Sequence, residues 1–155
     1  MSKSTFVYQT YIRTTQEKLW SALTDPDFMT QYWFGCRCES DWKVGSAWTL
    51  RSSEGAVLDD GKIIEADPPR RLVIEWQHRS KPELKTEPPT LCTIELEPVG
   101  TAIKLSITHT SDKDGSKLIE AVSGGWPKIM SNLKSLLENG AIALEEAYSK
   151  CASSA

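Results

Sequence analysis

Hydrophobic and polar positions follow two different periods in the first quarter of the chain. Residues 6–12 are rich in β-branched and aromatic side chains and predict a strand, and apolar residues then recur at helical spacing between Leu19 and Leu23. Asp25 ends this helix because a residue before proline favours extended conformations, whereas Pro26 suits the first turn of another helix. We therefore expect one strand followed by two short helices.

From Cys36 onward the pattern alternates with a period of two, which is typical of strands with one buried face. Residues 81–89 interrupt it with prolines and charges and predict a solvated loop. We expect a turn or bulge at Asp59-Asp60-Gly61. The pattern predicts an antiparallel meander with strands over 36–40, 46–50, 56–66, 72–78, 92–97 and 103–109.

An apolar stripe at helical period lies near the carboxyl end, formed by Trp126, Met130, Leu133 and Leu137. Gly124-Gly125 is expected to break a preceding helical turn over 117–123, and Pro127 suits the start of a new helix. The sequence thus predicts a long helix that opens at Gly125-Trp126-Pro127. Gly140 is a candidate stop, and residues 141–155 are either a tail or an extension of the helix.

This order of elements predicts an α+β domain over residues 1–140, with a curved antiparallel sheet wrapped around a long carboxy-terminal helix. One helix does not fill the whole concave face of such a sheet, so side-chain size decides between a packed core and a ligand-sized cavity. Both alternatives stay open. The candidate cavity residues are Tyr32, Trp33, Trp48, Ile74, Trp76, Ile107, His109, Trp126, Met130 and Leu133.

Composition narrows the functional classes. Hydrophobic residues make up 39% of the chain, charged residues 25%, and the mean hydropathy of −0.37 is that of a globular chain without a membrane span. A net charge of −3 and the lack of any basic run argue against nucleic acid as a partner. The amino terminus has no signal-like apolar stretch, so we expect a cytoplasmic protein. Six tryptophans supply the large rings that often line cores and ligand pockets.

The residues that often carry chemistry form no recognisable catalytic or metal motif. Cys36, Cys38 and Cys92 lack the second closely spaced pair of a structural zinc site, and no phosphate-binding loop is present, so we predict neither metal nor cofactor. In a reducing compartment the cysteines are expected to be free thiols. His109 is expected on the inner face, as a hydrogen-bonded core residue or as a ligand or acid–base group; we favour the core role and predict no catalytic residue.

Several segments, taken in order, resemble the activator of heat-shock protein 90 ATPase homologues, a family of the START-like or SRPBCC superfamily. They are Leu19-Trp20-Ser21-Ala22-Leu23-Thr24-Asp25-Pro26, Tyr32-Trp33, the stretch from Gly61 through Pro68-Pro69-Arg70-Arg71 to Trp76, the stretch from Thr101 to His109, and the stretch from Gly125-Trp126-Pro127 to Gly140. The resemblance implies a helix-grip fold, often with an apolar tunnel between the long helix and the sheet. It does not imply a single function.

Three functions are compatible with these observations. The one we favour is binding of a small hydrophobic molecule, with Tyr32, Thr108 or His109 orienting it. The second is a cyclase- or hydrolase-type enzyme that uses His109 as acid and base. The third is a chaperone-related interaction module or a homodimer that uses a sheet edge or the loop at 81–89. In the eukaryotic co-chaperone of the resembled family an additional amino-terminal domain makes much of the chaperone contact, and this chain begins at its first strand, so we rank that partner last.

Overall fold

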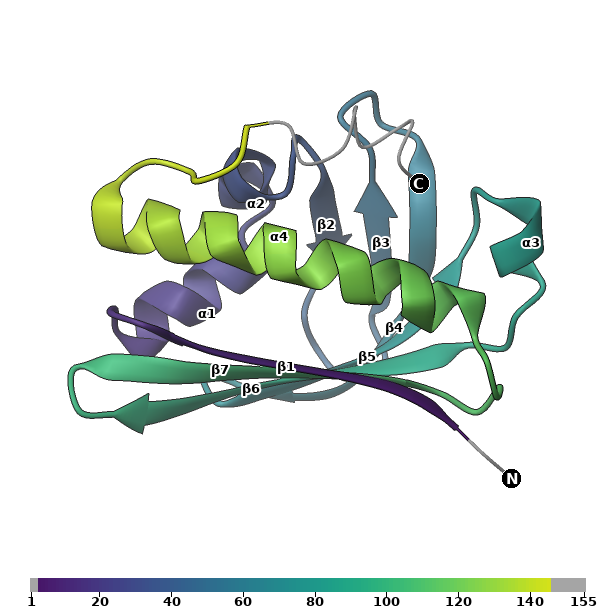
Figure 1. Ribbon diagram of the computed structural model, residues 1–155, viewed down its shortest axis with the longest axis horizontal. Helices are drawn as coiled ribbons and strands as arrows, with labels where there is room; N and C mark the ends of the chain where they lie inside the picture. Colours follow the sequence, from purple (N-terminus) through teal and green to yellow (C-terminus); the bar gives the residue numbers. More distant parts are fainter. Residues whose placement is uncertain (1–2, 146–155) are drawn as a thin grey trace.

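The computed structural model describes residues 3–145 as a curved antiparallel sheet with one long helix lying across its concave side (Figure 1). Residues 146–155 of the predicted tail lie outside the described residues. In chain order the elements are β1 (Ser4–Ile12), α1 (Gln16–Thr24), α2 (Pro26–Tyr32), β2 (Arg37–Ser40), β3 (Ala47–Arg51), β4 (Val57–Asp67), β5 (Arg71–His78), α3 (Pro82–Lys85), β6 (Thr90–Val99), β7 (Ala102–Ser111) and α4 (Lys117–Asn139).

The seven strands form one sheet in the order β1-β7-β6-β5-β4-β3-β2. The first strand therefore pairs with the last, and its register places Phe6 opposite His109 and Ile12 opposite Ile103. Helices α1 and α2 lie near one end of α4, and α3 lies near the other (Figure 1). The predicted α+β class, with a sheet wrapped around a long helix, is confirmed.

The side chains that the period-two pattern predicts on the inner face of the sheet are buried between the sheet and α4. On β5 the residues Leu72, Ile74, Trp76 and His78 are all buried, and the inner positions of β6 and β7 are equally enclosed. Burial of such apolar side chains is the main force that holds the sheet against α4.

Local capping explains why two short helices follow β1. Thr15 caps α1 by accepting a hydrogen bond from the Lys18 amide at 3.2 Å. Asp25 ends α1 and caps α2 through the Asp27 amide at 3.0 Å. The Tyr32 hydroxyl donates to the Ala22 carbonyl at 2.8 Å, which joins the two helices.

Helix α4 begins earlier than the sequence predicted. It runs without interruption from Lys117, so Gly124-Gly125 does not break it and Pro127 lies in its interior. The physical reason is a set of contacts at the first turn of the helix. The Ser116 side chain accepts a hydrogen bond from the Ile119 amide, and the carboxylate of Glu87 accepts from the Ser116 hydroxyl and the Lys117 amide. These contacts and the buried apolar face outweigh the local cost of glycine and proline. The helix ends at Asn139 and is capped by Gly140, the candidate stop, with φ of 80°.

The prediction of a turn or bulge at Asp59-Asp60-Gly61 is wrong. These residues lie inside β4, and the irregularities in its pairing fall between Leu50 and Arg51 on one side and between Ile63 and Glu65 on the other. Gly61 instead allows a close approach of two strands, because a Cβ at this position would lie 1.7 Å from the Glu75 carbonyl oxygen. Asp59, which lies within β4 and not in a turn, is buried.

The loop at 81–89 is more ordered than its composition suggested. It contains the single turn α3, and two of its side chains, Leu84 and Glu87, are buried. The expectation of a solvated loop is therefore wrong for these two residues.

Two of the cysteines, Cys38 and Cys92, are buried free thiols, and burial raises the pKa of both. Cys36 takes part in a disulfide bond, so the prediction of free thiols is wrong at this position. Across residues 3–145, no helix has the length and apolar character to cross a membrane.

Candidate functional site: a cavity between the sheet and helix α4

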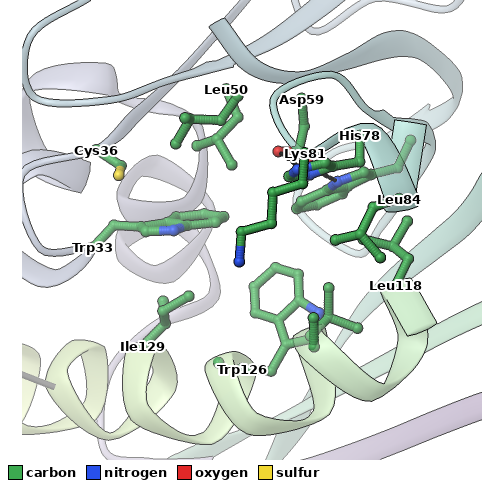
Figure 2. Close-up of a pocket in the computed structure, with 15 residues that line it drawn as sticks. Trp33, Cys36, Leu50, Asp59, His78, Lys81, Leu84, Leu118, Trp126 and Ile129 are labelled. Carbon is green, nitrogen blue, oxygen red and sulfur yellow. Dashed lines mark hydrogen bonds and ion pairs between the residues drawn. The ribbon is translucent and has the colours of Figure 1, made fainter. Parts of the chain in front are cut away.

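A cavity of about 140 Å³ separates the amino-terminal half of α4 from β4 and β5 (Figure 2). For comparison, an engineered protein cavity of about 150 Å³ holds one benzene molecule. A space of this volume suits one aromatic ring or a short aliphatic chain. The lining residues are Trp33, Cys36, Leu50, Leu58, Asp59, Trp76, His78, Lys81, Leu84, Leu118, Ala121, Val122, Gly125, Trp126 and Ile129.

Three indole rings from three parts of the chain form much of the wall. Trp33 follows α2, Trp76 lies on β5 and Trp126 lies on α4. The ring centroids of Trp33 and Trp126 are 5.4 Å apart, and those of Trp76 and Trp126 are 5.7 Å apart, which are ordinary separations for tilted aromatic pairs. Their mutual packing fixes the shape of the wall.

One side of the cavity carries a buried hydrogen-bonded cluster. The Asp59 carboxylate accepts from the Trp76 indole N–H, and its other oxygen lies 3.2 Å from Nδ1 of His78. With the proton on Nδ1, the His78 Nε2 accepts from the Ser80 hydroxyl at 2.8 Å. Asp59 and His78 are both about 95% enclosed, with exposures of 5% and 4%. Each oxygen of this buried carboxylate thus has a donor.

Among the lining residues that the structure describes, Lys81 brings a charge to the same space. Lys81 precedes α3, and its side chain extends from the rim so that its ammonium group ends between the rings of Trp33 and Trp126 (Figure 2). Within residues 3–145, the wall of the cavity therefore combines aromatic rings, the hydrogen-bonded carboxylate of Asp59 and the ammonium group of Lys81.

His109 lies outside the lining and has a complete set of partners. The Trp126 indole N–H donates to its Nδ1 at 3.2 Å, and its Nε2 lies 2.8 Å from the Thr90 hydroxyl. That hydroxyl donates to the Trp76 carbonyl, so Nε2 is the protonated nitrogen. Burial lowers the pKa of His109 to about 3, which keeps the ring neutral. This geometry favours the core role over the acid–base role.

The structure brings three of the ten predicted cavity residues to the wall, namely Trp33, Trp76 and Trp126. The others are buried around the cavity without lining it: Tyr32, Trp48, Ile74, Ile107, His109, Met130 and Leu133. Whether any of the ten contacts a ligand stays a prediction. Thr108, the remaining orienting candidate, is on the outward-facing side of β7, between the buried Ile107 and His109.

Sequence reasoning missed the polar lining and the first half of the helical wall. Leu118, Val122, Gly125 and Ile129 recur at spacings of four, three and four, which is a helical stripe that an earlier start of α4 would have identified. Asp59, His78 and Lys81 carry no such signal, because only the pairing of β4 with β5 and the fold of the following loop bring them together. Within residues 3–145, no cluster of three or more His, Cys, Asp or Glu side chains is placed to hold a metal ion.

A curved seven-stranded antiparallel sheet that grips one long helix, with a pocket between them, defines a helix-grip domain of the START-like or SRPBCC type. The model of one family within that class, described as activator of Hsp90 ATPase homolog 1-like protein, matches residues 13–138. The chain belongs to this family. No curated protein matched its sequence.

Solved structures show the same fold at low sequence identity. CalU16 from Micromonospora echinospora is 20% identical, with a TM-score of 0.70 over 88% of this chain and 77% of that one. The Aha1 dimer from Colwellia psychrerythraea is 23% identical, with a TM-score of 0.69 over 88% and 98%. PFC0360w, an HSP90 activator from Plasmodium falciparum, is 24% identical, with a TM-score of 0.70 over 86% and 95%. At these sequence identities, the similarities show a shared fold.

Proposed function

We infer that this protein binds a small hydrophobic or aromatic molecule in the cavity between α4 and the sheet. The observation that carries the proposal is the space of about 140 Å³ bounded by three indole rings. Apolar walls supply affinity by removing ligand surface from water, and a few polar groups at fixed positions set its orientation. Asp59, His78 and Lys81 are such groups. The cytoplasmic location expected from the sequence is part of this proposal.

Binding is tested by native mass spectrometry of the purified protein and by thermal shift against a panel of aromatic and aliphatic compounds. A ligand at one hundred times its dissociation constant stabilises the folded state by about 2.7 kcal/mol, which raises the melting temperature by several degrees. No bound species and no shift across the panel would contradict the proposal.

A matched pair of variants on α4 tests whether a bound ligand occupies this cavity. Ala121 lines the cavity yet is exposed, so Ala121→Phe places a ring over the opening without disturbing the core. The neighbouring Glu120 is also exposed but does not line the cavity, and Glu120→Phe is the control. We expect Ala121→Phe to abolish the ligand-induced shift and Glu120→Phe to retain it. Equal shifts in both variants would place the ligand elsewhere.

A protein-interaction role is the second candidate, because two structures of similar fold are an Aha1 dimer and an HSP90 activator. Sedimentation equilibrium and a pull-down with the Hsp90 chaperone test it. A monomer that does not bind the chaperone would remove this candidate and leave ligand binding untouched.

A further inference from the structure

We propose that this protein hydrolyses esters of small acids at the rim of the cavity, with Ser80 as the nucleophile, His78 as the general base and Asp59 as the residue that orients the imidazole. The inference rests on the proposed function, since the cavity would hold the acyl group of the ester, either one aromatic ring or a short aliphatic chain. It follows from three hydrogen-bonded side chains in the order that nucleophilic hydrolysis requires.

Strand pairing brings the carboxylate and the imidazole together. Asp59 on β4 lies directly opposite His78 on β5, and one carboxylate oxygen is 3.2 Å from Nδ1 of the imidazole. The other oxygen accepts from the Trp76 indole, which holds the carboxylate in place. Figure 2 shows Asp59 and His78 at one side of the cavity, and both are buried. The carboxylate therefore orients the ring and keeps the proton on Nδ1, so that Nε2 is an acceptor.

Ser80 lies just beyond the end of β5, where the backbone is held on both sides. The Arg79 amide donates to the Leu58 carbonyl at 2.8 Å, and the Lys81 carbonyl accepts from two amides of the turn α3. The Ser80 hydroxyl is 2.8 Å from Nε2 of His78. Ser80 is exposed and stands between two residues that line the cavity, His78 and Lys81. Its hydroxyl is thus available to a carbonyl group at the rim of the cavity.

The hydrogen-bonded order gives each proton and each bond of the reaction a place. The Ser80 oxygen bonds to the carbonyl carbon of the ester as Nε2 of His78 takes the hydroxyl proton, and Asp59 stabilises the imidazolium that forms. The bond between the carbonyl carbon and the alcohol oxygen then breaks, and the alcohol leaves with that proton. A water molecule attacks the acyl group on Ser80 by the same route. One ester and one water molecule are consumed, and one acid and one alcohol are released.

Hydrolysis of 4-nitrophenyl butyrate by the full chain tests the proposal, because this ester has a short aliphatic acyl group and releases coloured nitrophenol. We expect saturable hydrolysis by the wild type and a decrease in kcat/KM of at least about a hundredfold in Ser80→Ala. Ser80 is exposed, so Ser80→Ala should keep the wild-type melting temperature. Ser21 is an exposed serine on α1 that does not line the cavity, and Ser21→Ala should keep kcat/KM within about twofold of the wild-type value.

Covalent labelling identifies the nucleophile independently of turnover. Phenylmethanesulfonyl fluoride carries one aromatic ring, and an activated serine oxygen bonds to its sulfur while fluoride leaves and the hydroxyl proton is taken by the base. Tandem mass spectrometry should locate one sulfonyl group on Ser80 in the wild type and in Ser21→Ala, and none in Ser80→Ala. A serine that only supports the fold would give neither this label nor saturable hydrolysis.

Equal hydrolysis by the wild type and Ser80→Ala, a rate no higher than that of buffer, or a label on another residue would overturn the catalytic role of Ser80. Benzamide has no ester bond and reports on the cavity alone. Saturable binding of benzamide without ester hydrolysis would remove this inference and leave the proposed binding function in place, whereas absence of both would remove the two together. Benzamide should also compete with the ester, and hydrolysis that depends on Ser80 but is not slowed by benzamide would overturn the placement of the acyl group in the cavity.

Discussion

His109 sits at the centre of a chain of hydrogen bonds that runs from the Trp126 indole through its ring to the Thr90 hydroxyl and the Trp76 carbonyl. The chain joins α4, β7, β6 and β5 at one buried point. A proton added to the ring would place two donors face to face at Trp126 and leave a charge without water. The folded state therefore favours the neutral form of the His109 ring.

This arrangement predicts an acid-dependent loss of stability. The pKa of His109 falls to about 3 on folding from an ordinary value of 6.5, so the unfolded chain binds more protons between these limits. Stability from this residue is fully present above pH 6.5 and decreases by up to about 1.4 kcal/mol for each unit as the pH falls toward 3. Urea unfolding at several pH values measures the slope.

His109→Gln is the matched variant, because glutamine can accept from Trp126 and donate to Thr90 without titrating. Glu39 and Glu138, whose pKa values are lowered by hydrogen bonds, add an acid-dependent loss that both proteins share. The wild type should show the steeper decrease between pH 6.5 and 4. Identical slopes would mean that His109 is protonated in the folded state.

At the scale of elements, the first turn of α4 depends on a residue from a distant loop. Glu87 is buried, and its carboxylate accepts from the Ser116 hydroxyl at 2.5 Å and from the Lys117 amide at 2.9 Å. A carboxylate at a helix amino terminus satisfies free amides and interacts favourably with the helix dipole. The loop thus determines where the helix begins.

We expect Glu87→Gln to lower the free energy of unfolding by about 1–3 kcal/mol, since it removes the charge and sets an amide against the Lys117 N–H. Glu83 is exposed in the same loop, and Glu83→Gln should change stability by less than about 0.5 kcal/mol. Chemical denaturation of both variants tests this. Equal stability of the two would show that Glu87 does not support the helix.

Gly124 offers a test of α4 as one continuous helix. A Cβ at this position would meet no atom within 4 Å, and Gly124 lies inside the helix on an exposed face. Gly124→Ala should therefore stabilise the protein by about 0.5–1 kcal/mol. A clear destabilisation would indicate a bend that needs glycine at this site.

The sequence predicted strands better than helix boundaries for a physical reason. Alternation on β5 and β7 is imposed by burial of every second side chain and can be read locally. The start of α4 depends instead on Glu87, about thirty residues away along the chain, and the burial of Asp59 depends on the pairing of β4 with β5. Trp33, Trp76 and Trp126 were predictable as cavity residues because large rings favour buried walls, whereas Lys81 resembled any charged loop residue.

At the scale of the whole molecule, the curved sheet, with β1 paired to β7 at one edge, and the placement of α4 across it leave a cavity that the described side chains do not fill. Helices α1 and α2 position Trp33 at one side, and the loop containing α3 positions Lys81 at another. Elements from both halves of the chain thus build a single pocket, and its capacity to bind a ligand is the central claim.

Titration of ¹⁵N-labelled protein with benzamide, which carries one aromatic ring, followed by two-dimensional NMR, tests that claim most directly, since each indole N–H gives its own signal. We expect saturable shifts that are largest for the indole signals of Trp33, Trp76 and Trp126 and for the backbone amides of Gly125 and Ile129. The indole signal of Trp42, which lies outside the lining, should stay unchanged. Shifts confined to residues outside the cavity, or no saturable shift, would contradict it.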